Sequence, residues 1–175
     1  MQSGRKQQGF TLIELLITIA VLAIIVSVGI PSFFEQIDRQ RVAGAAHGLL
    51  SDLQFARAQS IKQNSEAYVV LDTVEWCYGV DAASSATCDC SAPAGCTVDG
   101  ATRIVTTGDF PGLSVNHNLG GDVLTFDPVR GTVSPTGTIN FVSDEGATAL
   151  SVVLNNRGRA RLCIVSGASW GYDEC

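Results

Sequence analysis

FTLIELLITIAVLAIIVSVGI, residues 10–30, is the stretch that decides the fold. Its 21 residues are apolar except for two threonines, Glu14, Ser27 and Gly29. At about 1.5 Å per residue, a helix of this length extends roughly 31 Å, which matches a hydrocarbon core of ~30 Å. The sequence therefore predicts a helix that spans a membrane over residues 10–30.

A short basic segment precedes this stretch. Residues 1–9 carry Arg5 and Lys6, contain no acidic residue and end at Gly9. A secretory signal peptide also starts with basic residues, but its apolar core is about 7–15 residues long and ends in small residues at a cleavage site. The apolar stretch continues well beyond that length, so the segment does not have the form of an ordinary secretory signal.

Glu14 is the residue in this stretch that needs an explanation. A carboxylate near the centre of a bilayer costs about 2.5–3.5 kcal/mol. One interpretation is that Glu14 lies close enough to the membrane surface for its side chain to reach water. The other is that a cation pairs with it inside the low-dielectric layer, which makes a buried carboxylate tolerable.

The helix is expected to continue beyond Pro31, with a kink there because proline removes one backbone hydrogen bond. From residue 39 onward, small or apolar residues recur at spacings of three and four: Val42, Ala46, Leu49, Leu53, Ala56 and Ser60. This spacing is typical of an amphipathic helix with one covered face. We therefore predict one helix over residues 10–63 whose second half packs against a domain.

Residues 64–175 show a different pattern, with short runs rich in Val, Ile, Tyr and Thr between turn-forming residues. The predicted strands are 67–71, 76–80, 102–106, 112–116, 122–126, 137–142, 150–155 and 159–165. Few connections are long enough for a crossover helix, which favours antiparallel pairing. The expected fold class is α+β, a long N-terminal helix packed on an antiparallel β-sheet domain, with a tight turn at Asn155-Asn156-Arg157-Gly158.

The composition indicates one small acidic domain after the helix. The chain has 175 residues and a formal net charge of −6. Without residues 1–9 it keeps 9 basic and 17 acidic residues, which gives about −8. A general nucleic-acid binder is usually basic, so any anion-binding role must come from a local patch.

Six cysteines follow the apolar stretch: Cys77, Cys88, Cys90, Cys96, Cys163 and Cys175. Their even number and loop-rich setting predict disulfides and an oxidising compartment. We expect Cys163 to pair with Cys175, and the other four to pair among themselves and hold the small, polar loop over residues 81–101. The alternative for those four is a metal site with four thiolates, although zinc sites favour cysteine pairs two to four residues apart.

No catalytic motif is recognisable in the sequence. His47 falls on the predicted helix and His117 in a predicted loop, and neither accompanies a nucleophile motif. The glycines are spread among turns and form no phosphate-binding loop. We therefore expect two surface histidines, no enzymatic activity, no cofactor and no metal.

Arg157, Arg159 and Arg161 form a local reversal of charge. Residues 64–175 contain five basic and thirteen acidic residues, and three of the five basic ones lie in this run. If Arg159 begins a strand, alternation places Arg159 and Arg161 on one face about 7 Å apart, where they suit phosphate oxygens. The alternative is pairing with a neighbouring chain or with acidic residues of the same chain: Asp144, Glu145, Asp173 and Glu174.

The segment GFTLIE, from Gly9 to Glu14, resembles the prepilin leader junction of type IV pilins and type II secretion pseudopilins. The resemblance implies that a prepilin peptidase cuts after Gly9, that the new terminal amine of Phe10 is methylated, and that Glu14 pairs with a terminal amine in the growing filament. It also implies a single-pass protein of the bacterial inner membrane with a periplasmic C-terminal domain, which later joins other pilins or pseudopilins in a pilus or pseudopilus.

Three further segments resemble the GspH, FimT and FimU group of minor pilins and pseudopilins: residues 53–64, 126–131 and 158–163. The group implies a minor pilin that acts in assembly or initiation of a type IV pilus, or at its tip. Gly158, Arg159 and Arg161 match a Gly-Arg-x-Arg motif that implies weak, non-specific DNA binding for uptake. The alternative role is the minor pseudopilin H of type II secretion. Pro31 favours the pilus, because that proline is more usual in pilins.

Overall fold

The computed structural model describes residues 10–74, 76–84, 88–144, 146, 148–167 and 171–175, without the side chains of residues 28–32. The chain divides into two compact units, Met1–Ile37 and Asp38–Cys175. Helix α1, Leu12–Gln63, contributes residues to both units and continues through Pro31.

Helix α1 begins with a side-chain cap. The N–H of Glu14 donates to Thr11 Oγ1 at 3.3 Å, so Thr11 satisfies a backbone donor that has no partner within the helix. Thr11 and Glu14 are also spaced as in the Ser/Thr-x-x-Glu pattern that favours a helix start. The apolar stretch therefore carries its own initiation signal at residues 11–14.

The first unit presents apolar side chains on all sides of the helix. Eleven large ones before residue 28 are between 44% and 77% exposed: Leu12, Ile13, Leu15, Leu16, Ile17, Ile19, Val21, Leu22, Ile24, Ile25 and Val26. The membrane span predicted over residues 10–30 includes residues 28–30, whose side chains lie outside the description. Within the described part of the chain, no helix is both long enough and apolar enough to cross a membrane.

The end of helix α1 is fixed by its backbone. Asn64 follows the last helical residue with a φ of 51°, in the left-handed region that asparagine tolerates. The N–H of Ser65 donates to the carbonyl of Ser60 at 3.2 Å, and that of Asn64 to the carbonyl of Ile61 at 3.4 Å. These two bonds form the Schellman arrangement that ends many helices.

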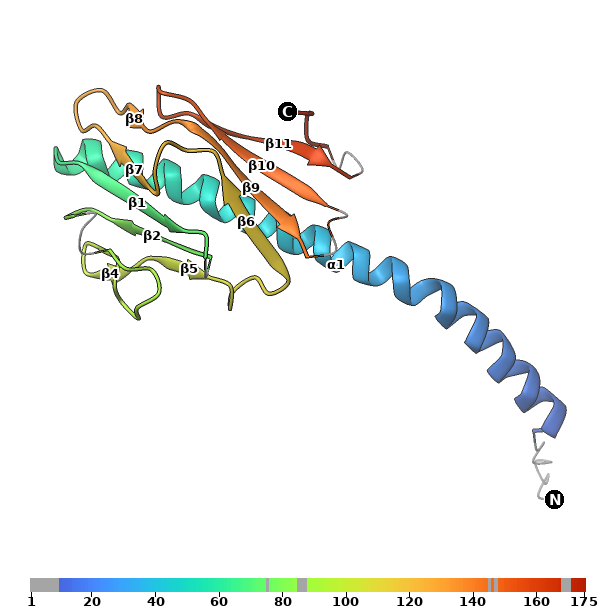
Figure 1. Ribbon diagram of the computed structural model, residues 1–175. Coiled ribbons are helices and arrows are strands. Elements are labelled where there is room, and N and C mark those ends of the chain that lie inside the picture. Colours follow the sequence, from blue (N-terminus) through green and yellow to red (C-terminus); the bar gives the residue numbers. More distant parts are fainter. Residues whose placement is uncertain (1–9, 75, 85–87, 145, 147, 168–170) are drawn as a thin grey trace, which may run out of the picture. The chain divides into compact units, whose positions relative to one another are not determined.

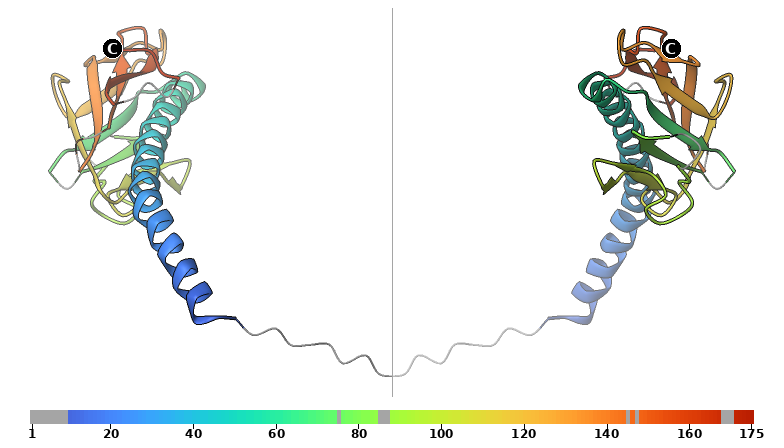
Figure 2. Two further views of the ribbon diagram at one scale, coloured as in Figure 1. Left: turned by 90° about the vertical axis from the view of Figure 1, so that its right-hand side faces the viewer. Right: turned by 90° about the vertical axis from the view of Figure 1, so that its left-hand side faces the viewer.

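In the second unit, one face of helix α1 is buried against the strands, which lie to one side of the helix (Figure 2). Its buried apolar residues are at most 2% exposed and follow the predicted stripe: Val42, Ala45, Ala46, Leu49, Leu53 and Ala56. They join side chains from both main sheets in a single core that includes Leu124, Phe126, Phe141 and Leu150. The amphipathic pattern therefore places the domain on the face that the spacing predicted.

The strands form two main antiparallel sheets (Figure 1). The first has the order β5-β2-β1-β7-β8 and consists of β1 (Ala67–Asp72), β2 (Cys77–Asp81), β5 (Ile104–Thr106), β7 (Val123–Phe126) and β8 (Val133–Ser134). The second has the order β11-β10-β9-β6 and consists of β6 (Leu113–His117), β9 (Gly137–Ser143), β10 (Ala149–Leu154) and β11 (Ala160–Ser166). A small pair joins β3 (Thr97–Val98) to β4 (Ala101–Thr102). The predicted α+β class is confirmed.

The divided strand and the position of His117 differ from the sequence prediction. The run predicted as one strand over residues 102–106 is divided, because β4 ends at Thr102 and β5 begins at Ile104. His117, predicted in a loop at the surface, is the last residue of β6, where it pairs with Ile139 and its side chain is only 9% exposed. Its Nε2 lies 3.3 Å from Asp122 Oδ1. The polar residues around His117 had suggested a surface loop, but the residue belongs to the sheet.

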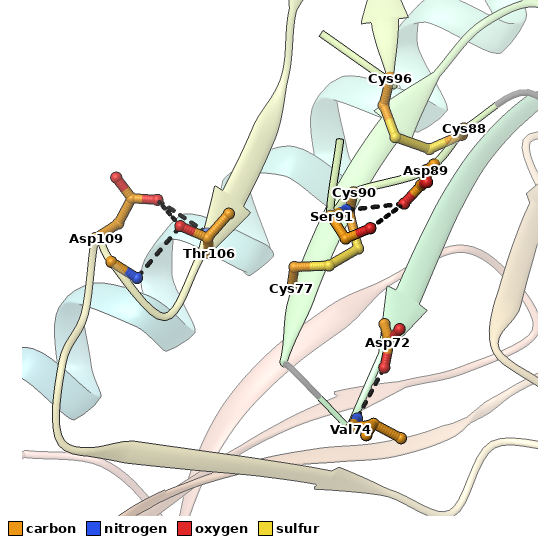
Figure 3. The surroundings of a disulfide bond; sticks show 11 residues. Asp72, Val74, Cys77, Cys88, Asp89, Cys90, Ser91, Cys96, Thr106 and Asp109 are labelled. Atoms are coloured by element: carbon orange, nitrogen blue, oxygen red, sulfur yellow. Dashed lines mark hydrogen bonds between the residues drawn. A yellow bond between two sulfur atoms is a disulfide. The ribbon is translucent and has the colours of Figure 1, made fainter. Parts of the chain in front are cut away.

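All six cysteines form disulfides: Cys77–Cys90, Cys88–Cys96 and Cys163–Cys175. Both expected sets are therefore observed, and oxidation leaves no thiolate among the four loop cysteines to bind a metal. Figure 3 shows the first two bridges beside Asp89, whose Oδ1 accepts from Ser91 Oγ at 2.6 Å and from Ser91 N–H at 2.9 Å. These hydrogen bonds lower the pKa of Asp89.

Candidate functional site

The turn between β10 and β11 carries the predicted arginine run. Asn155 Oδ1 accepts the N–H groups of Arg157 and Arg159, each at 3.1 Å. Gly158 has a φ of 69°, a conformation that glycine adopts without steric cost. The turn predicted from Asn155 to Gly158 is confirmed. Its hydrogen bonds hold the backbone of Arg157 and Arg159 in place.

The strand alternation of this run is as predicted. Arg159 precedes the first residue of β11 and Arg161 is its second residue, and both are exposed. Ala160 and Leu162 point the other way and pack against the core. The two guanidiniums therefore extend from the outer face of an edge strand.

Neither Arg159 nor Arg161, nor Arg157 before them, forms an ion pair within the described residues. Pairing with Asp144, Asp173 or Glu174, considered from the sequence, does not occur, because β11 carries the chain away from the turn before Ile164 pairs with Glu174. Glu145 lies outside the described residues. The positive charges of Arg157, Arg159 and Arg161 are therefore not neutralised by any described acidic residue of this chain.

An open groove of about 460 Å³ lies between the last turns of helix α1 and this hairpin. Its lining comes from two segments: Gln54, Arg57, Ala58 and Ile61 of the helix, and Gly158, Arg159 and Ala160 of the hairpin. Two arginines far apart in sequence therefore line one depression of the surface.

Arg57 is held at this groove by two glycine turns. A Cβ on Gly131 would lie 2.9 Å from Arg57 Nε, and one on Gly158 would lie 3.1 Å from the same atom. Because both positions lack a side chain, the backbones of the two turns can lie against the Arg57 guanidinium. Arg57 Nε is buried and has no hydrogen-bond partner.

The turn between β7 and β8 adds a further arginine. Asp127 Oδ1 accepts the backbone N–H groups of Val129 and Arg130 at 2.9 and 2.7 Å, which leaves the exposed Arg130 side chain without an ion pair in the part of the chain that the structure describes. The N–H of Val133 donates to the carbonyl of Asn156 at 3.2 Å and joins this turn to the β10–β11 turn. We call the five residues Arg57, Arg130, Arg157, Arg159 and Arg161 the arginine cluster.

Sequence reasoning missed Arg57 and Arg130. Arg57 stands beside the buried stripe of the helix and was considered only as one residue of the segment 53–64 that resembles the GspH, FimT and FimU group. Arg130 has a local signal that could have been used, because Arg130-Gly131 and Arg157-Gly158 both place an arginine before a glycine with positive φ. Such pairs mark turns from which an arginine extends into solvent.

A second polar contact fastens helix α1 to the first sheet. Asp52 accepts from the Tyr78 hydroxyl at 3.0 Å and forms an ion pair with Arg103 at 3.1 Å. The Arg103 guanidinium also lies 3.9 Å from the centre of the Phe55 ring. Burial raises the pKa of Asp52, and this effect is larger than the lowering by the Tyr78 hydrogen bond and by Arg103. Burial, and then the nearby Asp52 carboxylate, raise the pKa of Tyr78.

The two histidines take part in contacts rather than in a catalytic arrangement. His47 Nε2 lies 2.7 Å from the Tyr172 hydroxyl, which joins helix α1 to the segment before Cys175. His117 contacts Asp122, as described above. Among the residues that the structure covers, no group of three or more His, Cys, Asp or Glu side chains is arranged to hold a metal ion.

The predicted processing site lies at the start of the described chain. Gly9 is outside the described residues, and Phe10 is 83% exposed. Glu14 is exposed in the first turn of helix α1. Phe10 and Glu14 are therefore accessible in the single chain.

Comparison with known proteins agrees with these features. Residues 45–158 match the family model of the type II transport protein GspH, and residues 4–30 match the prokaryotic N-terminal methylation motif. The type II secretion system core protein G of Pectobacterium carotovorum is 33% identical over 82 residues, which are 42% of this chain and 53% of that protein.

Two solved structures share the fold. The minor pseudopilin EpsH of Vibrio cholerae superposes with a TM-score of 0.55 at 16% identity, over 71% of this chain and 97% of that one. The type IV minor pilin FimU of Pseudomonas aeruginosa gives 0.51 at 17% identity, over 69% and 90%. The fold is therefore pilin-like.

The family match covers more than half of the chain and lies within the α1 and β-sheet unit described above. Together with the methylation motif, it identifies a pilin or pseudopilin, a class whose members associate with other pilins in a filament. This chain belongs to the type II transport protein GspH family.

Proposed function

We propose that this chain is a minor subunit of a type IV pilus, acting in assembly or initiation or at the tip. The observation that carries the proposal is the exposed apolar surface of helix α1 before residue 28. A helix that is apolar all round is usually buried, and covering one Leu or Ile side chain contributes about 1.5–3 kcal/mol. Packing against helices of neighbouring subunits would bury this surface.

Maturation is proposed to begin with cleavage between Gly9 and Phe10 by a prepilin peptidase, followed by methylation of the Phe10 amine. The match of residues 4–30 to the N-terminal methylation motif supports this step. Before assembly, residues 10–30 would hold the protein in the inner membrane with residues 64–175 in the periplasm. Mass spectrometry of the protein from its host tests the step, and an intact Met1 or a cut at another bond would contradict it.

Glu14 is proposed to pair with a terminal amine in the filament. Because Glu14 also occupies the third helical position after the Thr11 cap, the two roles must be separated. Glu14→Gln keeps a side chain that suits the cap and removes the charge, whereas Glu14→Ala removes both. Incorporation into sheared filaments should fall in both variants, and normal incorporation of Glu14→Gln would show that the cap alone matters.

The second candidate machine is the type II secretion pseudopilus, with the chain as minor pseudopilin H. The GspH family model favours it, whereas Pro31 favours the pilus. Deletion in the host separates the two. Loss of surface pili with normal protein secretion supports the pilus, and the reverse result supports the pseudopilus.

DNA binding through Arg157, Arg159 and Arg161 is proposed as an additional activity of the pilus subunit. Their exposure, and the lack of ion pairs to them within the described residues, support it. With about three phosphates neutralised on duplex DNA, log affinity should fall with log salt at a slope near −3. Full-length protein in detergent is titrated with duplex DNA at two salt concentrations. If the Arg159→Gln, Arg161→Gln double variant bound DNA as tightly as the wild type, the proposed DNA binding would be contradicted.

A further inference from the structure

The groove between helix α1 and the β10–β11 turn contains a cation whose hydrogen bonding is incomplete. Arg57 Nε is buried without a hydrogen-bond partner, and a buried N–H donor normally finds an acceptor. Arg159 lines the same groove and has no ion pair among the described residues. Arg57 as a whole is only partly buried and lines the groove, so its guanidinium can receive an acceptor from another molecule there.

The remaining lining indicates what kind of acceptor fits. Ala58, Ile61, Gly158 and Ala160 offer small or apolar surface beside the two guanidiniums, and Ile61 is 52% exposed. A duplex phosphate backbone is polar along its whole length and gains nothing from such surface. An aspartate or glutamate on a protein segment combines apolar carbon atoms with a carboxylate that arginine can bind with two hydrogen bonds.

The acids near this groove are already engaged within the chain. Asp99 accepts from Gln63 Nε2 at 2.8 Å and pairs with Lys62 at 3.5 Å. Asp127 accepts from backbone N–H groups of its own turn. Since neither acid pairs with Arg57 or Arg159, these two arginines remain available for an external carboxylate.

The opposite end of the second sheet carries charges of the other sign. Strand register puts Leu154 beside Gly137 and Ala160 at the arginine end, whereas Ala149 pairs with Val142 at the other end. The acids that follow this other end form no ion pair within the described residues: Asp144, Asp173 and Glu174. The second sheet therefore carries arginines at one end of its strands and these acids at the other.

We propose that the groove receives a carboxylate-bearing segment of the next pilin-fold subunit in the filament. Arg57 and Arg159 bind the carboxylate, and Ile61 covers the apolar part of the segment. This inference rests on the proposed role as a filament subunit. The contact joins two different ends of neighbouring domains, and such head-to-tail contacts repeat without closing, as a helical filament requires.

The test is site-specific photo-crosslinking in assembled filaments of the host. The photoreactive residue p-benzoylphenylalanine replaces Ile61 in the full chain, and in a control chain it replaces Val74, which is 92% exposed and lies outside the groove. After irradiation, mass spectrometry maps each adduct. The expected adduct from Ile61 joins a peptide of a pilin-fold subunit that contains Asp or Glu close to the linked residue.

Arg57→Gln and Arg159→Gln should each reduce this adduct on the order of tenfold, since each removes a charge-assisted contact. Arg159 is exposed, so its variant remains informative if Arg57→Gln fails to fold. Lys62→Gln removes a positive charge next to Ile61, but Lys62 pairs with Asp99 and does not line the groove, so this control variant should leave the adduct unchanged.

Three outcomes would overturn the inference: no Ile61 adduct in filaments that contain the chain, an adduct to nucleic acid or to a segment without acids, or an adduct that both groove variants leave intact. Absence of the chain from filaments would overturn the proposed function and this inference together. The filament fraction therefore distinguishes the two failures.

Discussion

Gly158→Ala should destabilise the domain much more than the same change at Gly146. Both glycines have left-handed backbone, with φ of 69° at Gly158 and 68° at Gly146. An alanine in this conformation costs roughly 1–2 kcal/mol at either position. At Gly158 the new Cβ would lie 2.4 Å from the Gly131 carbonyl oxygen, whereas at Gly146 no atom of the other described residues lies within 4 Å. Forcing the two turns apart adds about 1–3 kcal/mol, as overpacking of a tight site usually does.

The assay is thermal unfolding of the full chain in detergent, followed by near-ultraviolet circular dichroism. For a domain of this size 1 kcal/mol corresponds to on the order of 3 °C in Tm. Gly146→Ala should therefore lower Tm by about 3–6 °C and Gly158→Ala by about 6–15 °C. Equal losses would refute the reasoning, because they would mean that the hairpin moves away from Gly131 without cost and that the wall of the groove is not fixed.

Three further predictions follow from the core, the disulfides and a buried carboxylate. Leu49→Ala, at a position with no exposed surface, should lower the free energy of unfolding by about 2–5 kcal/mol in denaturant titrations, and a loss below 1 kcal/mol would contradict its place in the core. Replacing Cys163 and Cys175 by serine opens a bridge with a sequence separation of 12 and should cost about 3 kcal/mol in the same assay, whereas an unchanged midpoint would contradict it. Because burial raises the pKa of Asp52 above its ordinary 3.8, the stability of the wild type relative to Asp52→Asn should be highest at low pH and fall as pH rises through the raised pKa. A relative stability that rises with pH would show that the ion pair with Arg103 outweighs burial.

The sequence predicted the elements that extend over several periods. The stripe from Val42 to Ala56 repeats often enough to define a helix face, and β9, β10 and β11 each contain at least six residues of strand pattern. The strands β3 and β8 were not predicted, because two residues carry no period. Each of these two strands is defined by its pairing with a neighbouring strand, β4 or β7, and not by its own composition.

The candidate site was only partly predictable for a related reason. Arg157, Arg159 and Arg161 are neighbours in sequence, so their charge was visible. Arg57 joins them because Gly131 and Gly158 lie against its side chain, and Arg130 joins them because Val133, the first residue of β8, bonds to Asn156. Tertiary contacts of this kind have no local signal. Neither does the pairing of Cys77, Cys88, Cys90 and Cys96, for which three connectivities are possible.

The crossed order of the first two disulfides has a consequence for proteolysis. Cys88 lies between Cys77 and Cys90, and Cys90 lies between Cys88 and Cys96, so the two bridges interlock along the chain. A protease that cuts once before Cys88 leaves the pieces joined by the first bridge, and one that cuts after Cys90 leaves them joined by the second. A cut at Asp89 leaves both bridges spanning the break. No single nick between Cys77 and Cys96 can therefore separate the part of the chain with helix α1 from the strands that follow.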